Sequence, residues 1–124
     1  MSDNLPSILR EVRADLGDYF LSSDIVGLDG ISISGEAAEP GFNTELAAAH
    51  IAMIMKLAER VSGNLKLGRV TENQLTTNEL IALSRPLGDG SFYWSVVAKG
   101  EATYGLMRAV MDQYDLRLWG AISA

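Results

Sequence analysis

The single histidine, His50, is the side chain whose ordinary pKa best suits proton transfer near neutral pH. It stands directly before Ile51 in an apolar stretch, and no second residue of a metal-ligating type lies nearby at a suitable spacing. A packed or interface position therefore explains this histidine better than acid–base or metal chemistry. The chain has no cysteine, which removes thiolate nucleophiles, disulfides and cysteine-ligated metals.

Carboxylates recur at short spacing in two places, Glu36 with Glu39 and Asp112 with Asp115. Such pairs can act as acid and base in glycoside hydrolysis. Nothing else around either pair supports catalysis, and solvated surface charge is the simpler interpretation.

Two further signals of chemistry are also weak. Ser22 and Ser23 have no base partner, and the segments GLDG and GDG fall at expected hairpin turns rather than before helices. No segment matches GxxxxGK[ST], so the chain is not itself a P-loop GTPase. We therefore predict a protein that is not an enzyme and that has no catalytic residues, metal or cofactor.

The composition is that of an ordinary globular domain. Of the 124 residues, 48% are hydrophobic and 21% are charged, which suits one core, and the formal net charge of −6 disfavours a nucleic-acid surface. The start, MSDNLPS, lacks the features of a secretion signal, and the longest strongly apolar run, Ile51 to Met55, is too short to span a membrane. We expect one domain over residues 1–124, a cytoplasmic location and no membrane insertion.

The stretch from Thr44 to Ser62 is the element around which the chain is organised. Asn43 or Thr44 can cap its start, and Gly63 is expected to end it. A helix this apolar must bury more than one face, either against its own sheet and a second protein or entirely inside the core. Its apolar positions are Leu46, Met53, Leu57 and Val61 in one stripe, Ala47, Ile51, Ile54 and Ala58 in a second, and Ala48, Ala52 and Met55 beside them.

Periodicity and turn signals predict the remaining elements. Two strands have little alternation, so we expect helices on both faces of the sheet. A more polar strand is expected at a sheet edge. In order, the predicted elements are a helix over Leu5–Phe20, a hairpin over Ile25–Gly35 around Asp29-Gly30, the central helix, the edge strand over Gly68–Gln74, strands over Leu80–Arg85 and Ser91–Ala98, and a helix over Ala102–Trp119.

Taken together, these segments resemble the Roadblock (dynein light-chain) family, especially its MglB-like prokaryotic branch. The resemblance rests on the hairpin VGLDGISIS, the Ala-rich central helix, the hairpin LSRPLGDGSFYWSVVA and the helix start TYGLMRAVM. It covers roughly Leu5 to Leu118 and depends on the order of elements, not on one diagnostic motif. It implies an α+β fold, profilin-like and longin-like. A five-stranded antiparallel sheet would carry the first and third helices on one face and the central helix on the other.

The resemblance also implies a homodimer, in which edge strands join two sheets and the central helices lie side by side above the junction. The exposed part of the helix pair would bind a partner through Ala48, Ala52, Met55, Lys56 and Glu59. The dimer contacts would include Ile51, Arg69, Val70, Glu72 and Gln74.

Members of this family act on small Ras-like GTPases as scaffold, co-regulator or activating protein. The resemblance therefore implies a homodimeric regulator or scaffold that binds such a GTPase, with stimulation of GTP hydrolysis as a further step. Arg60 and Arg69 are candidates for an arginine finger, although solvated surface charge explains both more simply. Two alternatives stay open. One is a nucleotide-independent dimeric assembly module for a larger complex, and the other is a small-molecule sensor or enzyme, which the scarcity of convergent polar groups disfavours.

Overall fold

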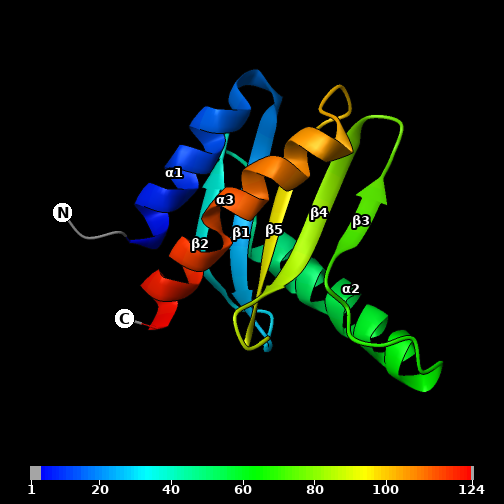
Figure 1. Cartoon of the computed structure of the whole chain (residues 1–124). Helices are drawn as coiled ribbons and strands as arrows, with labels where there is room; N and C mark the ends of the chain where they lie inside the picture. The colour runs from blue at the N-terminus through cyan, green and yellow to red at the C-terminus, as the bar shows by residue number, and fades with distance from the viewer. Residues whose placement is uncertain (1–3, 124) are drawn as a thin grey trace.

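Five antiparallel strands form one sheet in the order β2-β1-β5-β4-β3, with α-helices on both faces (Figure 1). The structure is a computed structural model that describes residues 4–123; residues 1–3 and 124 of the predicted domain lie outside this range. The predicted α+β fold class and order of elements are confirmed. The elements are α1 (Leu5–Leu16), the 3₁₀ turn η1 (Gly17–Tyr19), β1 (Phe20–Gly27), β2 (Ser32–Ala37), α2 (Thr44–Asn64), β3 (Asn73–Thr76), β4 (Leu80–Leu87), β5 (Phe92–Lys99) and α3 (Tyr104–Ser123).

Helix α1 is shorter than predicted. Asn4 caps it as expected, because its side chain accepts a hydrogen bond from the Ser7 amide at 3.0 Å. The helix ends at Leu16, since Gly17 adopts a φ of 57°, and Phe20 already begins β1. The apolar period that suggested a helix as far as Phe20 therefore continues through a turn into a strand.

The central helix α2 is longer than predicted. It passes through Gly63 and ends at Asn64, so the expected stop at this glycine is wrong. The left-handed residue lies three positions later, at Lys66, with a φ of 56°. At the start of the helix, Asn43 accepts a hydrogen bond from the Leu46 amide at 3.0 Å, as a capping residue does.

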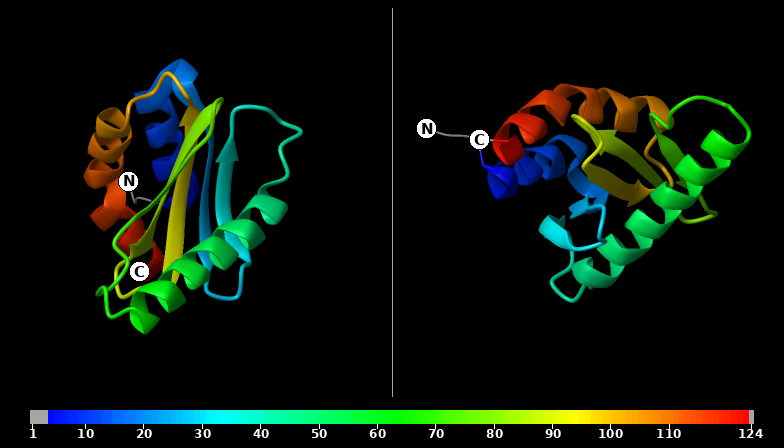
Figure 2. Two further views of the ribbon diagram at one scale, coloured as in Figure 1. Left: turned by 90° about the vertical axis from the view of Figure 1, so that its right-hand side faces the viewer. Right: turned by 90° about the horizontal axis from the view of Figure 1, so that it is seen from below.

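The two faces of the sheet carry cores of very different size. Helices α1 and α3 cover one face and enclose the larger cluster, which includes Trp94, Leu83 and Met107. Helix α2 crosses the other face and encloses a small cluster around Tyr93 and Val26 (Figure 2). This arrangement of helices confirms the prediction. Among residues 4–123, no helix has the length and apolar character that crossing a membrane requires.

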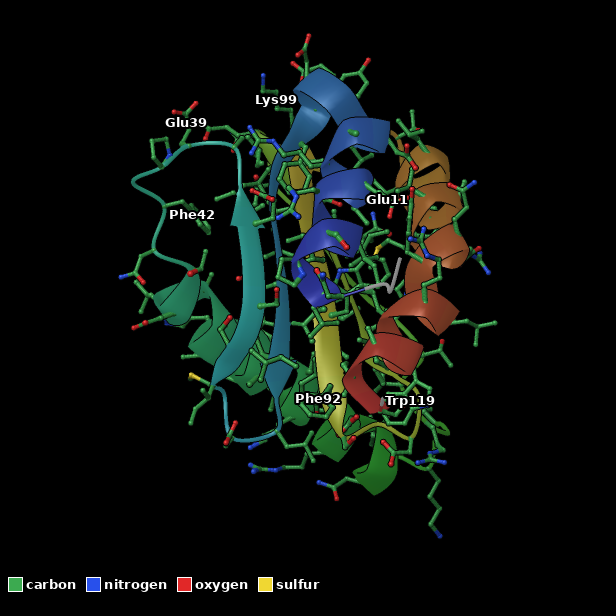
Figure 3. All side chains as sticks on the ribbon, turned by 90° about the vertical axis from the view of Figure 1, so that its left-hand side faces the viewer. Glu11, Glu39, Phe42, Phe92, Lys99 and Trp119 are labelled. Atoms are coloured by element: carbon green, nitrogen blue, oxygen red, sulfur yellow. The ribbon has the colours of Figure 1, made fainter. Side chains whose placement is uncertain are left out.

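The end of α3 packs against the β4–β5 turn. Leu118 is buried, and Trp119 and Ile122 pack against the larger core. In Figure 3, Trp119 and Phe92 lie at the same end of the molecule. A Cβ at Gly88 would lie 2.1 Å from the Trp119 ring, so only glycine fits this turn. Gly105, in contrast, is exposed, and a Cβ there would meet no other atom within 4 Å.

One row of cross-strand neighbours is polar from one edge of the sheet to the other. It lies on the α2 face, because side chains alternate along strands and this row is two residues from Val26 and Tyr93 of the small cluster. The row comprises Gly35, Asp24, Ser95, Ser84 and Asn73, each paired with the next.

Asp24 is the buried carboxyl group of this row. It is 1% exposed, and neither its Oδ1 nor the Oγ of Ser22 has a hydrogen-bond partner among the described residues. A Cβ at Gly35 would lie 2.7 Å from Oδ1, so the glycine leaves room for the carboxyl group. Burial raises the pKa of Asp24 to about 7, since an apolar setting disfavours the charged form.

This burial predicts a pH-dependent stability. Between about pH 4 and pH 7 the folded chain keeps a proton on Asp24 that the unfolded chain releases. The free energy of unfolding should therefore fall with rising pH, by up to about 1.4 kcal/mol per pH unit from this group. Urea unfolding of the wild type and of Asp24→Asn across this interval should show the extra fall only in the wild type. Asp18→Asn, at an exposed position, should behave like the wild type. Equal slopes in the wild type and Asp24→Asn would contradict the prediction.

Candidate functional site

Ala48, Ala52 and Met55 face the sheet. All three are buried and pack around Tyr93 and Val26, with Ile51 partly buried beside them. The expectation that Ala48, Ala52 and Met55 are exposed on a helix pair is therefore wrong. The short alanine side chains let the helix backbone approach the sheet, so this side of α2 is occupied by the chain's own core.

The opposite side of α2 is apolar and exposed, and we call it the outer face. Met53 is 65% and Leu57 is 58% exposed. The outer face comprises Leu46, Met53, Ile54, Leu57 and Val61, and exposed Phe42, Leu65 and Leu67 extend it at the two helix ends. Figure 3 shows Phe42 on the loop between β2 and α2. Large apolar patches on proteins mark surfaces that another molecule covers.

The sequence contained the signal for this orientation. Leu46, Met53, Leu57 and Val61 form one stripe in the sequence, and it is the exposed one. The alanines on the other side are the signal that was missed, because small residues fit a close helix–sheet contact and bulky residues then remain outside.

Charged residues lie beside the outer face. Lys56, Glu59 and Arg60 are exposed. The Tyr93 hydroxyl donates to Oε2 of Glu59 at 3.1 Å; burial, together with this carboxylate, raises the pKa of Tyr93 to about 12. A role of Lys56 and Glu59 in partner binding stays a prediction.

The last part of α2, residues 56–64, is less covered by its own chain than the start of the helix, and we call it the overhang. None of its residues is buried, whereas the earlier part of the helix buries three. In Figure 1 the end of the helix projects past β3, and Figure 2 shows the same projection from below. The overhang carries Leu57 and Val61 of the outer face.

The edge strand beside the overhang differs from the prediction. It runs from Asn73 to Thr76 and not from Gly68 to Gln74. Of the predicted dimer residues only Gln74 lies in it, exposed, donating to the Thr76 hydroxyl at 2.9 Å. Arg69, Val70 and Glu72 precede the strand. Arg69 is exposed, Val70 packs against the small core cluster, and Glu72 binds Arg85 on the opposite face of the sheet.

The two edges of the sheet are not equivalent. On the β2 edge the register with β1 is interrupted by a bulge between Ile25 and Val26, which leaves exposed Ile33 without a direct partner. The register of β3 with β4 is regular throughout. A bulge blunts an edge against pairing with another strand, so β3 is the edge that remains suited to it.

The α2 face of the sheet is only partly covered between β5 and the β3 edge. Val97, Ala82 and Leu75 form the cross-strand row on the far side of the polar row from α2. Val97 and Ala82 are half-buried, Leu75 is exposed, and none of them belongs to either core cluster. The chain thus has an overhanging apolar helix and an apolar sheet surface, neither of which covers the other.

The described residues contain no arrangement that favours catalysis. No group of three His, Asp or Glu residues among them could hold a metal ion. Nδ1 of His50 lies 3.1 Å from the Leu46 carbonyl oxygen of its own helix. A hollow of about 660 Å³ lies between the end of α2, residues 68–71 and the β4–β5 turn, with Glu59, Arg69 and Asp89 among its lining residues. The lining therefore carries charges of both signs.

The orientation of α2 predicts opposite outcomes for two methionines. Met55→Asp should lower the free energy of unfolding by about 3–5 kcal/mol, because it buries an unpaired charge. Met53→Asp, two positions away on the exposed side, should change it by less than about 1 kcal/mol. Chemical unfolding followed by circular dichroism, at chain concentrations low enough to suppress association, measures both. A larger loss for Met53→Asp would reverse the assignment of the two helix faces.

The sequence matches no protein-family profile and no curated protein. Solved structures, however, are similar over nearly the whole chain. A Roadblock/LC7 domain from Streptomyces avermitilis has a TM-score of 0.86 at 15% identity, covering 98% of this chain and 100% of that one. Myxococcus xanthus MglB has a TM-score of 0.84 at 12% identity, covering 94% and 93%. Profilin II from Acanthamoeba castellanii has a TM-score of 0.60 at 15% identity, covering 93% and 96%. The chain therefore has the fold of Roadblock/LC7 domains and of MglB, as the resemblance implied, and a more distant likeness to profilin.

Proposed function

We propose that this chain is a homodimeric, non-enzymatic regulator or scaffold of the MglB-like Roadblock type that binds a small Ras-like GTPase. The observation that supports the proposal best is the apolar overhang of α2 beside the regular edge strand β3. This geometry supports the dimer, and the shared fold together with the sequence resemblance supports the class of partner.

The overhang requires cover. Leu57 and Val61 lie on a stretch of helix with no buried residue, and a helix with apolar residues in water is stabilised when another surface covers them. A second copy of the chain is the simplest source of that surface, because the free edge of β3 lies next to the overhang (Figure 1).

A single two-fold axis would pair the free edges of β3 and cover both overhangs. Antiparallel pairing of β3 with β3 of a twin places the axis perpendicular to the sheet, so both α2 helices lie on the same face of one continuous sheet. The rotation also exchanges the two ends of the sheet. The overhang lies toward the end with the β4–β5 turn, since Gly63 lines the same hollow as Gly88. In the dimer it would therefore lie over the other half of its twin's sheet, where Val97 and Ala82 are half-buried and Leu75 is exposed.

Binding of a GTPase would use what remains exposed above the helix pair. Leu46, Met53 and Ile54 supply apolar area, and Lys56 and Glu59 supply charges beside it. A dimer that binds the GTP-bound conformation more tightly would order the switch regions of the GTPase. Faster hydrolysis follows if that ordering positions the catalytic groups of the GTPase itself.

The dimer is tested by two leucine substitutions. Leu57→Asp should weaken self-association by about 100-fold or more, because two-fold symmetry places the unpaired charge in the interface twice. Leu116→Asp is the matched control, since Leu116 is 85% exposed on α3, on the far face of the sheet. Sedimentation equilibrium of the wild type and both variants gives the dissociation constants. A monomeric wild type, or an equal effect of the two substitutions, would contradict the proposed dimer.

The partner class is tested by capture in two nucleotide states. The purified chain should retain a Ras-like GTPase from lysate with a non-hydrolysable GTP analogue and much less of it with GDP. Met53→Asp, which changes the outer face without entering the core, should lose the capture. The same prey in both states would favour the alternative, a nucleotide-independent assembly module. Recovery of no GTPase in either state would contradict this half of the proposal.

A further inference from the structure

Arg85 links β4 to α3 and to the segment that precedes β3, on the α1–α3 side of the sheet. It extends from β4 and is 7% exposed. Its Nη1 donates to Asp112 at 2.9 Å and to Asp115 at 2.8 Å, both on α3, and its Nη2 donates to Glu72 at 2.8 Å. Burial alone would lower the pKa of Arg85, but the bonds with these carboxylates outweigh it and raise the pKa. The guanidinium is therefore a permanent charge at this site.

Glu72 is held at both carboxylate oxygens. Oε1 accepts from Arg85, and Oε2 accepts from the Tyr104 hydroxyl at 2.6 Å. Glu72 directly precedes Asn73, the first residue of β3, which pairs with Ser84 next to Arg85. The two bonds thus fix the chain at the point where it enters the edge strand.

Little else holds this entry point. In the segment 65–72, Leu65, Lys66 and Leu67 donate backbone hydrogen bonds only to the end of α2. Among the described residues from Gly68 to Thr71, none makes a hydrogen bond to the sheet or to α3, although Val70 packs against the small cluster. The strand itself has four residues, so its free edge depends on how its first residue is held.

Arg85 would still be paired with carboxylates if Glu72 lost its charge. Three carboxylates surround one guanidinium, and Oδ1 of Asp115 has no partner. If Glu72 is neutralised, Asp112 and Asp115 still pair with Arg85, so no buried charge is left alone. Loss of Arg85 would instead leave three carboxylates next to one another, which is costly. Glu72 and Arg85 should therefore behave differently when substituted.

We infer that Glu72, held by Arg85 and Tyr104, is the positioning residue that sets strand β3 in register for pairing with a second copy of this chain. The inference rests on the proposed dimer for its purpose, but the positioning itself is a property of one chain. Arg85 is the anchor, Tyr104 is the second support, and the segment 65–72 is the part that these contacts restrain.

Hydrogen exchange and self-association together test the positioning role. Glu72→Gln and Tyr104→Phe should each raise exchange by about tenfold at those amides of residues 73–76 that bond to β4, with the global unfolding midpoint unchanged. Each should also weaken the dimer by about tenfold, because a loosened strand must be ordered before it pairs. Exchange is measured at chain concentrations below the dissociation constant, so that it reports on the single chain.

Glu79→Gln is the matched control, since it removes the same charge from an exposed residue in the turn at the other end of β3. It should change neither exchange nor association. Arg85→Met should lower the global stability, in contrast to Glu72→Gln. Unchanged exchange at residues 73–76 in Glu72→Gln, or a parallel loss of global stability, would overturn the inference. If the wild type proves monomeric, the exchange result still decides the positioning role, and the proposed dimer fails separately.

Discussion

The narrow contact between α2 and the sheet is the constraint on which the rest of the surface depends. Two alanines and one methionine make that contact, around Tyr93 and Val26, whereas α1 and α3 enclose a much larger core on the other face. Because the contact is small and lies toward one end of the sheet, it leaves the bulky side of α2 exposed, and it leaves the overhang and the sheet surface near β3 only partly covered. The fold of one chain is supported mainly by its α1–α3 side, and its α2 side remains available for other molecules.

The polar residues of the α2 face fit this division. The row through Asp24, Ser95 and Ser84 lies between the half of the sheet that α2 covers and the half that it does not. A buried carboxyl group without a partner is costly, so this row adds little to the stability of the single chain. The ion pairs of Arg85 lie on the other face, and they hold the start of the edge strand against the stable half of the molecule.

Most of the fold was predicted correctly from the sequence, but the orientation of α2 was not. Hairpin signals at Asp29-Gly30 and Gly88-Asp89-Gly90 and the helical spacing of apolar residues gave the order of elements correctly. Ala48, Ala52 and Met55 were placed on the wrong side of α2, because an all-round apolar helix has no polar face to show which side is outward. The edge strand was placed too early, because segment 65–72 mixes apolar and polar residues as a strand does. Contacts such as that of Glu72 with Arg85 join residues that are 13 positions apart in the sequence, beyond any local pattern, and only the structure reveals them.

The bulge in β2 sets a limit on how many chains can join through their strands. A sheet with two equally regular edges could add chain after chain and grow into a fibre, since each addition would present a fresh edge. Here Ile33 interrupts one edge, so a pair of chains joined through β3 would present only interrupted edges to solvent. Strand pairing would then be saturated by a single partner, and a high cellular concentration of the chain would yield more pairs rather than longer assemblies.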